Sequence, residues 1–198
     1  MEGRRLYGRE LGRWHLTAYS DADWARDINT RRSTTGFVVF LGHNPISWLS
    51  KKPSSVSISS TEVEYPALAN NASDLFWIRQ VLQDLQICLP NPPIVNCDNL
   101  AAIALSSNPV YHSRFKHLDI DFHFIREKVQ RKDLIVQYIP TEEQLADVFA
   151  KGLHSPIFSQ HFAHLRLGYP SQLGLRGIDN CNNSEELVSK HVTPRDVS

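Results

Sequence analysis

The sequence has few cysteines, no excess charge of either sign and no long apolar run. Its three cysteines, Cys88, Cys97 and Cys181, are widely spaced and form no CxxC pair, so the sequence indicates neither a disulfide framework nor a cysteine zinc site. No stretch approaches the roughly 20 apolar residues of a membrane span, and the start of the chain lacks the apolar core of a signal peptide. We therefore expect an intracellular protein, cytoplasmic or nuclear, that is neither secreted nor bound to a membrane.

Charge and length limit the function classes further. The 21 basic and 21 acidic side chains cancel, so binding of nucleic acid must come from local patches rather than a global positive field. A chain of 198 residues with 41% hydrophobic content can bury one sizeable core. We expect one domain over residues 14–168, an N-terminal extension at 1–13, and a polar, aperiodic tail at 169–198 that is disordered.

The first part of the expected domain favours strands. Residues 14–58 are rich in Thr, Ser, Val, Phe and Trp, and turn signals separate the apolar runs. The pattern predicts three antiparallel strands, the last of them interrupted at a proline. They are expected at about 14–21, 35–41 and 46–58.

A long helix is predicted to begin within a residue or two of Thr61, where the apolar period changes to that of a helix. Capping boxes that start at Ser59 or at Thr61 are both open. Pro66 falls about five residues into this helix, where an interior proline costs about 3 kcal/mol. A start near Tyr65 would instead make Pro66 a tolerated first-turn residue and Glu64 a cap with a different aim.

The rest of the domain alternates strands with helices. The expected elements are a strand at 94–98, helices at about 100–105 and 116–131, a strand at 134–139, and a helix capped by Thr141. Strands reached through helical crossovers pair in parallel. The order therefore predicts an α/β fold with a mixed five-stranded sheet, three antiparallel strands followed by two parallel ones, flanked by helices. The ends of the first and fourth strands would lie side by side.

Four acidic residues fall where this topology brings them to one edge of the sheet. Asp21 and Asp98 end runs typical of buried strands, where a carboxylate is costly without a cation. Glu64 and Asp147 fall in helix-opening stretches, where exposed amides favour a carboxylate. Taken singly, each acid also fits a helix cap or a solvated turn. Together, the four can hold two hard cations that activate water and stabilise the leaving oxygen of a phosphodiester.

Six segments, in this order and spacing, are typical of one family. They are YSDADWA at 19–25, DINTRRSTTGF at 27–37, ISWLSKKPSSVSISSTEVEY at 46–65, CDNLAAIAL at 97–105, HSRFKHLDIDFHFIREKV at 112–129 and YIPTEEQLADVFAKGL at 138–153. Over about residues 14–168 the chain resembles the ribonuclease H domain of the Pol polyprotein of Copia-type long-terminal-repeat retrotransposons.

The resemblance implies an RNase H-like fold and an endoribonuclease that cleaves the RNA strand of an RNA/DNA hybrid. It implies that Asp21, Glu64, Asp98 and Asp147 are the catalytic and metal-binding acids, with two Mg²⁺ ions as cofactor and Mn²⁺ as a substitute. Glu64 is preferred to Glu62 because the family's acid precedes an aromatic or apolar residue and small helix formers. The implied ancestral partners are the reverse transcriptase and integrase of the same polyprotein, in a virus-like particle.

Six residues are candidates for binding the hybrid: Ser60, Thr61, Asn99, Arg114, Lys116 and His117. The two hydroxyl residues at a helix N-terminus suit a phosphate, although capping explains them equally well. The asparagine can meet a 2′-hydroxyl from the minor groove or stabilise a turn. The last three residues form the densest basic patch of the chain.

Two rival interpretations follow from the same residues. If Pro66 misplaces Glu64, the chain is a catalytically inactive relic that keeps only the fold or weak binding of nucleic acid. An integrase core is expected to carry three acids with the last close to the third, and the wide separation of Asp98 from Asp147 argues against it. The chain also begins almost at its first expected strand, as expected for a fragment of a polyprotein.

Overall fold

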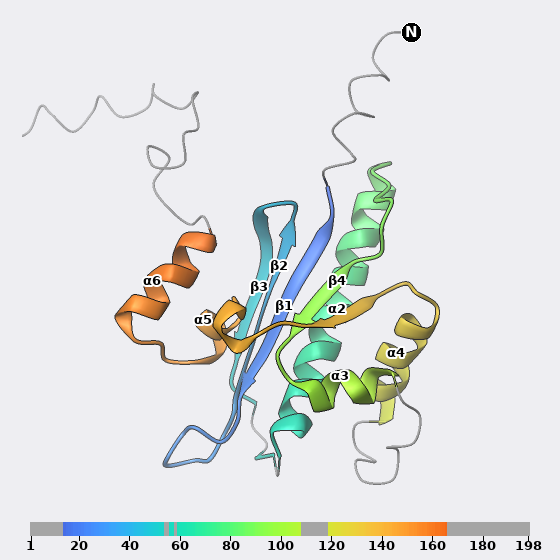
Figure 1. Cartoon of the computed structure of the whole chain (residues 1–198). Coiled ribbons are helices and arrows are strands. Elements are labelled where there is room, and N and C mark those ends of the chain that lie inside the picture. The colour runs from blue at the N-terminus through green and yellow to red at the C-terminus, as the bar shows by residue number, and fades with distance from the viewer. Residues whose placement is uncertain (1–13, 54–55, 58, 108–118, 166–198) are drawn as a thin grey trace, which may run out of the picture. The chain divides into compact units, whose positions relative to one another are not determined.

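Five strands form one mixed sheet in the order β3-β2-β1-β4-β5 (Figure 1). The computed structural model describes residues 14–53, 56–57, 59–107 and 119–165. β1 pairs antiparallel with β2, and β2 with β3, while β4 runs parallel to β1 and to β5. This confirms the predicted sheet of three antiparallel and two parallel strands. The strands are β1 (Leu16–Asp23), β2 (Thr34–Leu41), β3 (Asn44–Lys51), β4 (Ile94–Cys97) and β5 (Ile135–Tyr138).

Two strand ends differ from the prediction. β1 continues two residues further than expected, because Ala22 and Asp23 still pair with β2. β3 ends at Lys51 and not near residue 58. Pro53 has no N–H to donate to a ladder, so the chain leaves the sheet at this point.

The lengths of some helices differ from the predicted ones. They are α2 (Ser60–Asp84), α3 (Leu100–Ser107), α4 (Asp119–Gln130), α5 (Asp147–Ala150) and α6 (Ser155–His164), with a 3-10 helix at Thr141–Glu143. The prediction of a single helix starting at Thr141 is wrong. Gln144 is extended, and its side chain bonds to the Ser20 carbonyl and the Ala146 N–H, so the helix stops after one turn.

Helix α2 begins where the first capping box predicts. The Ser59 side chain accepts a hydrogen bond of 3.3 Å from the Glu62 N–H. Pro66 lies inside the helix, so the Glu62 carbonyl lacks its usual donor four residues on. The helix nevertheless continues for 25 residues. The alternative start near Tyr65 is therefore wrong, and Glu64 lies within the helix rather than at its cap.

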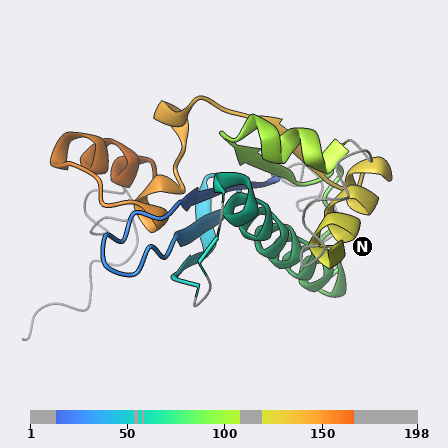
Figure 2. The same cartoon turned by 90° about the horizontal axis from the view of Figure 1, so that it is seen from below.

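The two faces of the sheet pack against different helices. Along β2, Phe37 and Val39 join the larger core with α2, α3 and α4, whereas Val38 and Phe40 face the opposite way and pack near Leu165. Figure 2 shows α2 running along one face of the sheet. In Figure 1, α3 and α4 lie on the side of β4, and α5 and α6 on the side of β3.

None of the described helices has the length and apolarity needed to cross a bilayer. Cys88 is exposed and Cys97 buried, and both are free thiols. Cys181, the expected extension at 1–13 and the expected tail at 169–198 lie outside the described residues, so the predicted domain limits stay predictions.

Candidate active site

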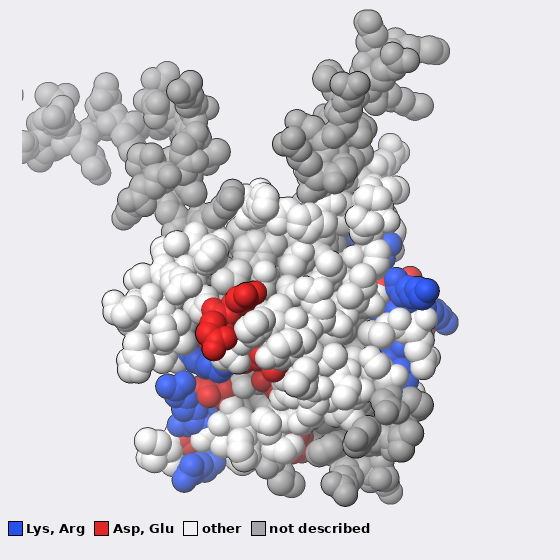
Figure 3. Space-filling model, viewed as in Figure 1, with Lys and Arg blue, Asp and Glu red and all other residues white. Residues whose placement is uncertain are grey.

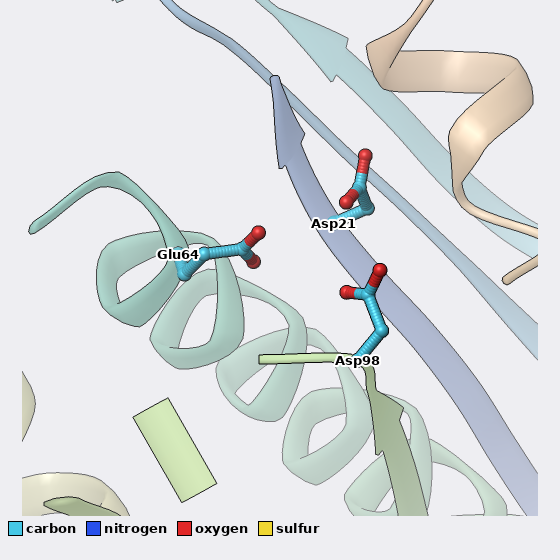
Figure 4. Close-up of side chains that lie close together, drawn as sticks. All are labelled: Asp21, Glu64 and Asp98. Carbon is cyan, nitrogen blue, oxygen red and sulfur yellow. The ribbon is translucent and has the colours of Figure 1, made fainter. Parts of the chain in front are cut away.

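Three carboxylates converge at the end of β1 (Figure 4). Asp21 comes from β1, Glu64 from α2, and Asp98 directly follows β4. One oxygen of each side chain lies within 4.8 Å of one oxygen of the other two. Asp21 and Glu64 are almost fully buried, at 1% and 5% exposed, and Asp98 is half-buried. The structure thus brings three of the four predicted acids together.

The register of the sheet explains why Asp21 and Asp98 are neighbours. β1 and β4 run parallel with Tyr19 opposite Asn96, and each aspartate follows two residues further along its chain. β4 ends at Cys97, just before Asp98. At this level Glu64 approaches from α2, so the three side chains point toward one another.

The fourth acid, Asp147, joins this group through a lysine. Lys151 Nζ donates to Asp21 Oδ1 at 3.0 Å and to Asp147 Oδ1 at 2.8 Å. Asp147 opens α5 and is 5% exposed, and Lys151 follows the helix one turn later. Sequence reasoning missed Lys151. The available signal was its spacing, because an acid and a lysine four residues apart lie on one face of a helix.

Helix α5 can reach the site because β2 has a glycine opposite Asp21. Gly36 pairs with Asp21 in the sheet. A Cβ on Gly36 would lie 2.7 Å from Phe149 Cβ and 2.8 Å from the Ala150 nitrogen, closer than real atoms approach. The glycine therefore permits close contact between the strand and the helix, and this contact places Asp147 and Lys151 beside Asp21.

Three buried side-chain amides donate to consecutive carbonyls of β1. They belong to β4, to α2 and to the segment before α5, which are the elements that carry or lead to Asp98, Glu64 and Asp147. Each element that supplies an acid is therefore also tied to β1, a feature that sequence reasoning missed. The bonds run from Asn96 Nδ2 to Ala18 (3.1 Å), Asn71 Nδ2 to Tyr19 (3.1 Å) and Gln144 Nε2 to Ser20 (3.0 Å).

Burial and mutual repulsion oppose ionisation of these acids. Burial raises the pKa of Asp21 to about 7; Lys151 acts to lower it, and the charges of Asp147 and Asp98 act to raise it. Burial, followed by the charges of Asp21 and Asp98, raises the pKa of Glu64 well above its usual range. In addition, Asp21 Oδ2 and Glu64 Oε2 are buried without a hydrogen-bond partner. Such groups are costly unless something pairs with them.

The donor set fits a hard divalent cation. Carboxylate oxygens are the ligands that Mg²⁺ and Mn²⁺ prefer, and a cation held by Asp21, Glu64 and Asp98 would pair the two unpartnered oxygens. An open pocket of about 330 Å³ gives access to the acids. Thr141 Oγ1 donates to Asp98 Oδ2 at 3.1 Å and fixes the orientation of that carboxylate, a contact that the sequence did not reveal. The pocket is lined by Asp21, Ala22, Glu64, Asp98, Asn99, Leu100, Tyr138 and Lys151.

The predicted substrate residues are only partly described. Ser60 and Thr61 form the first turn of α2, next to the capping Ser59. Asn99 Oδ1 accepts hydrogen bonds of 3.0 Å from the N–H groups of residues 101 and 102, which begin α3, so its turn-stabilising role is present. Its contact with a 2′-hydroxyl stays a prediction. The basic patch lies outside the described residues: Arg114, Lys116 and His117.

Charged side chains on the visible surface form small local groups (Figure 3). Figure 3 shows acidic side chains gathered near the middle of one face, with small basic groups below them and at the right edge. Most of the described surface on this face is uncharged. It therefore offers no continuous basic stripe among its described residues for a nucleic-acid backbone.

Solved RNase H structures share this fold. The N-terminal RNase H domain of a Mycobacterium tuberculosis protein is 13% identical, with a TM-score of 0.51 over 76% of this chain and 97% of that chain. An RNase H1 isolated from compost is 20% identical, with a TM-score of 0.52 over 75% of this chain and 98% of that chain. At such low identity the similarity concerns the fold alone, and the protein has an RNase H-like fold.

Sequence similarity shows to which family of proteins with this fold the chain belongs. The retrovirus-related Pol polyprotein of transposon RE1 of Arabidopsis thaliana is 51% identical over 148 residues, 75% of this chain. That of transposon TNT 1-94 of Nicotiana tabacum is 40% identical over 136 residues, 69% of this chain. The chain spans 10% of the length of each polyprotein, and no family model matches it. The chain belongs to the RNase H domains of retrovirus-related Pol polyproteins.

Proposed function

We propose that this domain is an endoribonuclease that cleaves the RNA strand of RNA/DNA hybrids with the help of divalent cations. The observation that carries the proposal is the convergence of Asp21, Glu64 and Asp98, two of them with unpartnered buried oxygens, on an RNase H-like fold. One solved structure of the same fold is an RNase H1 in complex with an RNA/DNA hybrid, which supports this substrate class.

In this proposal Asp21, Glu64 and Asp98 hold a Mg²⁺ ion, Asp147 contributes to a second, and Mn²⁺ can replace either. A bound divalent cation lowers the pKa of a coordinated water and stabilises charge on a phosphodiester oxygen. The chain itself supplies the oriented carboxylates. Thr141 fixes the orientation of Asp98 through its hydroxyl.

Binding of the substrate is proposed to involve the predicted hydroxyl, amide and basic residues. Asn99 lines the pocket that gives access to the acids, so it lies where a hybrid would approach. Ser60 and Thr61 lie four and three residues before Glu64, at the N-terminus of α2, which suits a phosphate. The reverse transcriptase and integrase of the same polyprotein are proposed as partners, and the location is proposed to be intracellular.

The test is cleavage of an end-labelled RNA strand in an RNA/DNA hybrid, with and without Mg²⁺, by the wild type and by Asp98→Asn. We expect metal-dependent cleavage by the wild type, a loss on the order of a thousandfold in Asp98→Asn, and unchanged binding of the hybrid. Asp84→Asn, an exposed acid at the end of α2, is the matched control and should cleave normally. Full activity of Asp98→Asn would contradict the assigned site.

A second candidate function is binding of nucleic acid without cleavage, as in a degenerate copy. The observation that favours it is Pro66 inside α2, two residues from Glu64. Against it, Glu64 still reaches the carboxylate cluster. Hybrid binding by a folded wild type with no cleavage in Mg²⁺ or Mn²⁺ would support this second candidate.

A further inference from the structure

The cluster of four acids, Asp21, Glu64, Asp98 and Asp147, also contains the ammonium group of Lys151. Lys151 Nζ lies 3.0 Å from Asp21 Oδ1 and 2.8 Å from Asp147 Oδ1, and its side chain is only 20% exposed. The backbone N–H of Lys151 also bonds to the Asp147 carbonyl at 2.8 Å, which holds the residue against the end of α5. The ammonium is therefore a fixed part of the site rather than a surface charge that swings past it.

The two oxygens of Asp21 have different surroundings. Oδ1 is paired with Lys151, whereas Oδ2 is buried and has no hydrogen-bond partner. Glu64 Oε2 is unpartnered in the same way, and Glu64 belongs with Asp21 and Asp98 to the close group of three. A first divalent cation can thus be held by this group without disturbing the pair of Lys151 and Asp147.

The balance of charges also favours binding of one divalent cation while Lys151 stays in place. Once a first divalent cation has displaced the protons of Asp21 and Glu64, the four acids carry four negative charges. The cation and Lys151 together then leave the cluster slightly negative. A second divalent cation would make it positive while the lysine stays in place. Two cations at contact distance repel strongly in a partly buried site, so the lysine and a second ion compete for the space between Asp21 and Asp147.

We propose that Lys151 is a positioning residue that occupies the place of a second cation between Asp21 and Asp147. The site then takes up one divalent ion readily and a second only when the lysine ammonium is displaced. This inference rests on the proposed metal-dependent nuclease function, and it concerns how many ions the free protein binds, not whether it cleaves. It also explains how Asp147 is held at the site before any second ion arrives.

The test is titration of the metal-free full chain with Mn²⁺, with free Mn²⁺ measured by electron paramagnetic resonance. For the wild type we expect one ion per chain at low concentration and a second at about tenfold or higher concentration. For Lys151→Gln, the dissociation constant of the second ion should fall about tenfold or more, while that of the first changes less than about threefold. Lys151→Arg, which keeps a cation, should restore the wide separation of the two steps.

Controls separate a local effect from a loss of folding. Lys132→Gln removes an exposed lysine after α4 and should titrate as the wild type does. Circular dichroism checks each fold, and Lys151→Met, which keeps the packing of the aliphatic stem, replaces Lys151→Gln if the latter does not fold. Titrations of Lys151→Gln and Lys151→Met identical to that of the wild type would overturn the inference and leave the nuclease proposal standing. Failure of the folded wild type to bind any Mn²⁺ would overturn both.

Discussion

The three clustered acids and the fourth acid are held in place by two different kinds of structure. Asp21, Glu64 and Asp98 come from β1, α2 and the end of β4, whose apolar side chains build the larger core. Asp147 comes from α5, a helix of four residues on the opposite face of the sheet. It is held by the contact at Gly36, by Gln144, and by a hydrogen bond of 2.6 Å from Ser50 Oγ to the Phe149 carbonyl.

Because of this difference, the stability of the fold and the assembly of the complete site depend on different regions. Substitutions among the first three acids change charges beside the larger core, two of which are almost fully buried. Substitutions around α5 act on the placement of Asp147 and Lys151 and leave the larger core intact. The two regions should therefore respond differently to mutation, pH and metal.

The largest effect is expected from Asp21→Asn. Cleavage should fall on the order of a thousandfold because the residue belongs to both the clustered acids and the Lys151 pair. In EDTA the free energy of unfolding should not fall, since a neutral amide avoids the cost of burying the Asp21 charge and Lys151 keeps Asp147 as its partner. Single-turnover cleavage and urea unfolding measure the two quantities. A large loss of stability in EDTA would contradict this description of the core region.

The second largest effect is expected in the pH dependence of the free energy of unfolding of the metal-free protein. Native Asp21 keeps its proton up to about pH 7, whereas the unfolded chain releases it near 3.8, so the native state binds more protons in between. The free energy of unfolding should therefore fall as pH rises through this window. Asp21 contributes about 4 kcal/mol at most, and the raised pKa of Glu64 adds a fall of the same sign. Urea unfolding in EDTA measures the slope. Saturating Mg²⁺ should flatten the slope, and Asp21→Asn should reduce it but leave the part that comes from Glu64. A slope as steep in Asp21→Asn as in the wild type would exclude this role of Asp21.

The region around α5 is tested by Gly36→Ala. The added Cβ would collide with Phe149 and Ala150 and push α5 off β2, so cleavage should fall roughly a hundredfold. The melting temperature should fall by only a few degrees, because α5 contributes little to the larger core. Gly152→Ala is the matched control, since a Cβ there meets nothing within 4 Å. Equal effects of the two substitutions would show that α5 is not held by close approach.

The smallest effect on cleavage is expected from Pro66→Ala. The helix regains a hydrogen bond to the Glu62 carbonyl, worth up to about 3 kcal/mol, but the unfolded chain gains up to about 1 kcal/mol of conformational freedom. We therefore expect a rise of about 2 kcal/mol in the free energy of unfolding and cleavage within about threefold of the wild type. Recovery of cleavage from an inactive wild type would instead show that Pro66 disables Glu64.

The sheet could be predicted from sequence because local signals agree with its topology. Turn residues separate alternating strands, and Ser59 caps α2 through the Glu62 N–H as one of the two capping boxes predicts. The same topology places Asp98 beside Asp21, since parallel strands end at one edge. Interior Pro66 shows the limit of such reasoning, because the packing of α2 outweighs the local preference to start the helix later.

The region around α5 could not be predicted in the same way. Its path depends on Gln144, whose hydrogen bond reaches Ser20, 124 residues away along the chain. The local sequence around Thr141 favours a continuous helix, but the hydrogen bond from Gln144 to Ser20 ends it after one turn. The role of Lys151 likewise depends on Asp21, 130 residues away. Only the tertiary structure brings these groups together.

The three amides that donate to β1 also have a consequence for folding kinetics. Their partners are 52, 78 and 124 residues away in sequence, so the carbonyls of one short strand receive donors from three successive parts of the chain. Contacts of such long range form slowly, because loop entropy must be lost before they can stabilise the fold. During synthesis from the N-terminus, α2 and then β4 become available to β1 before Gln144 does. We therefore expect the cluster of four acids to be completed in a late step of folding, when the segment before α5 closes onto Ser20.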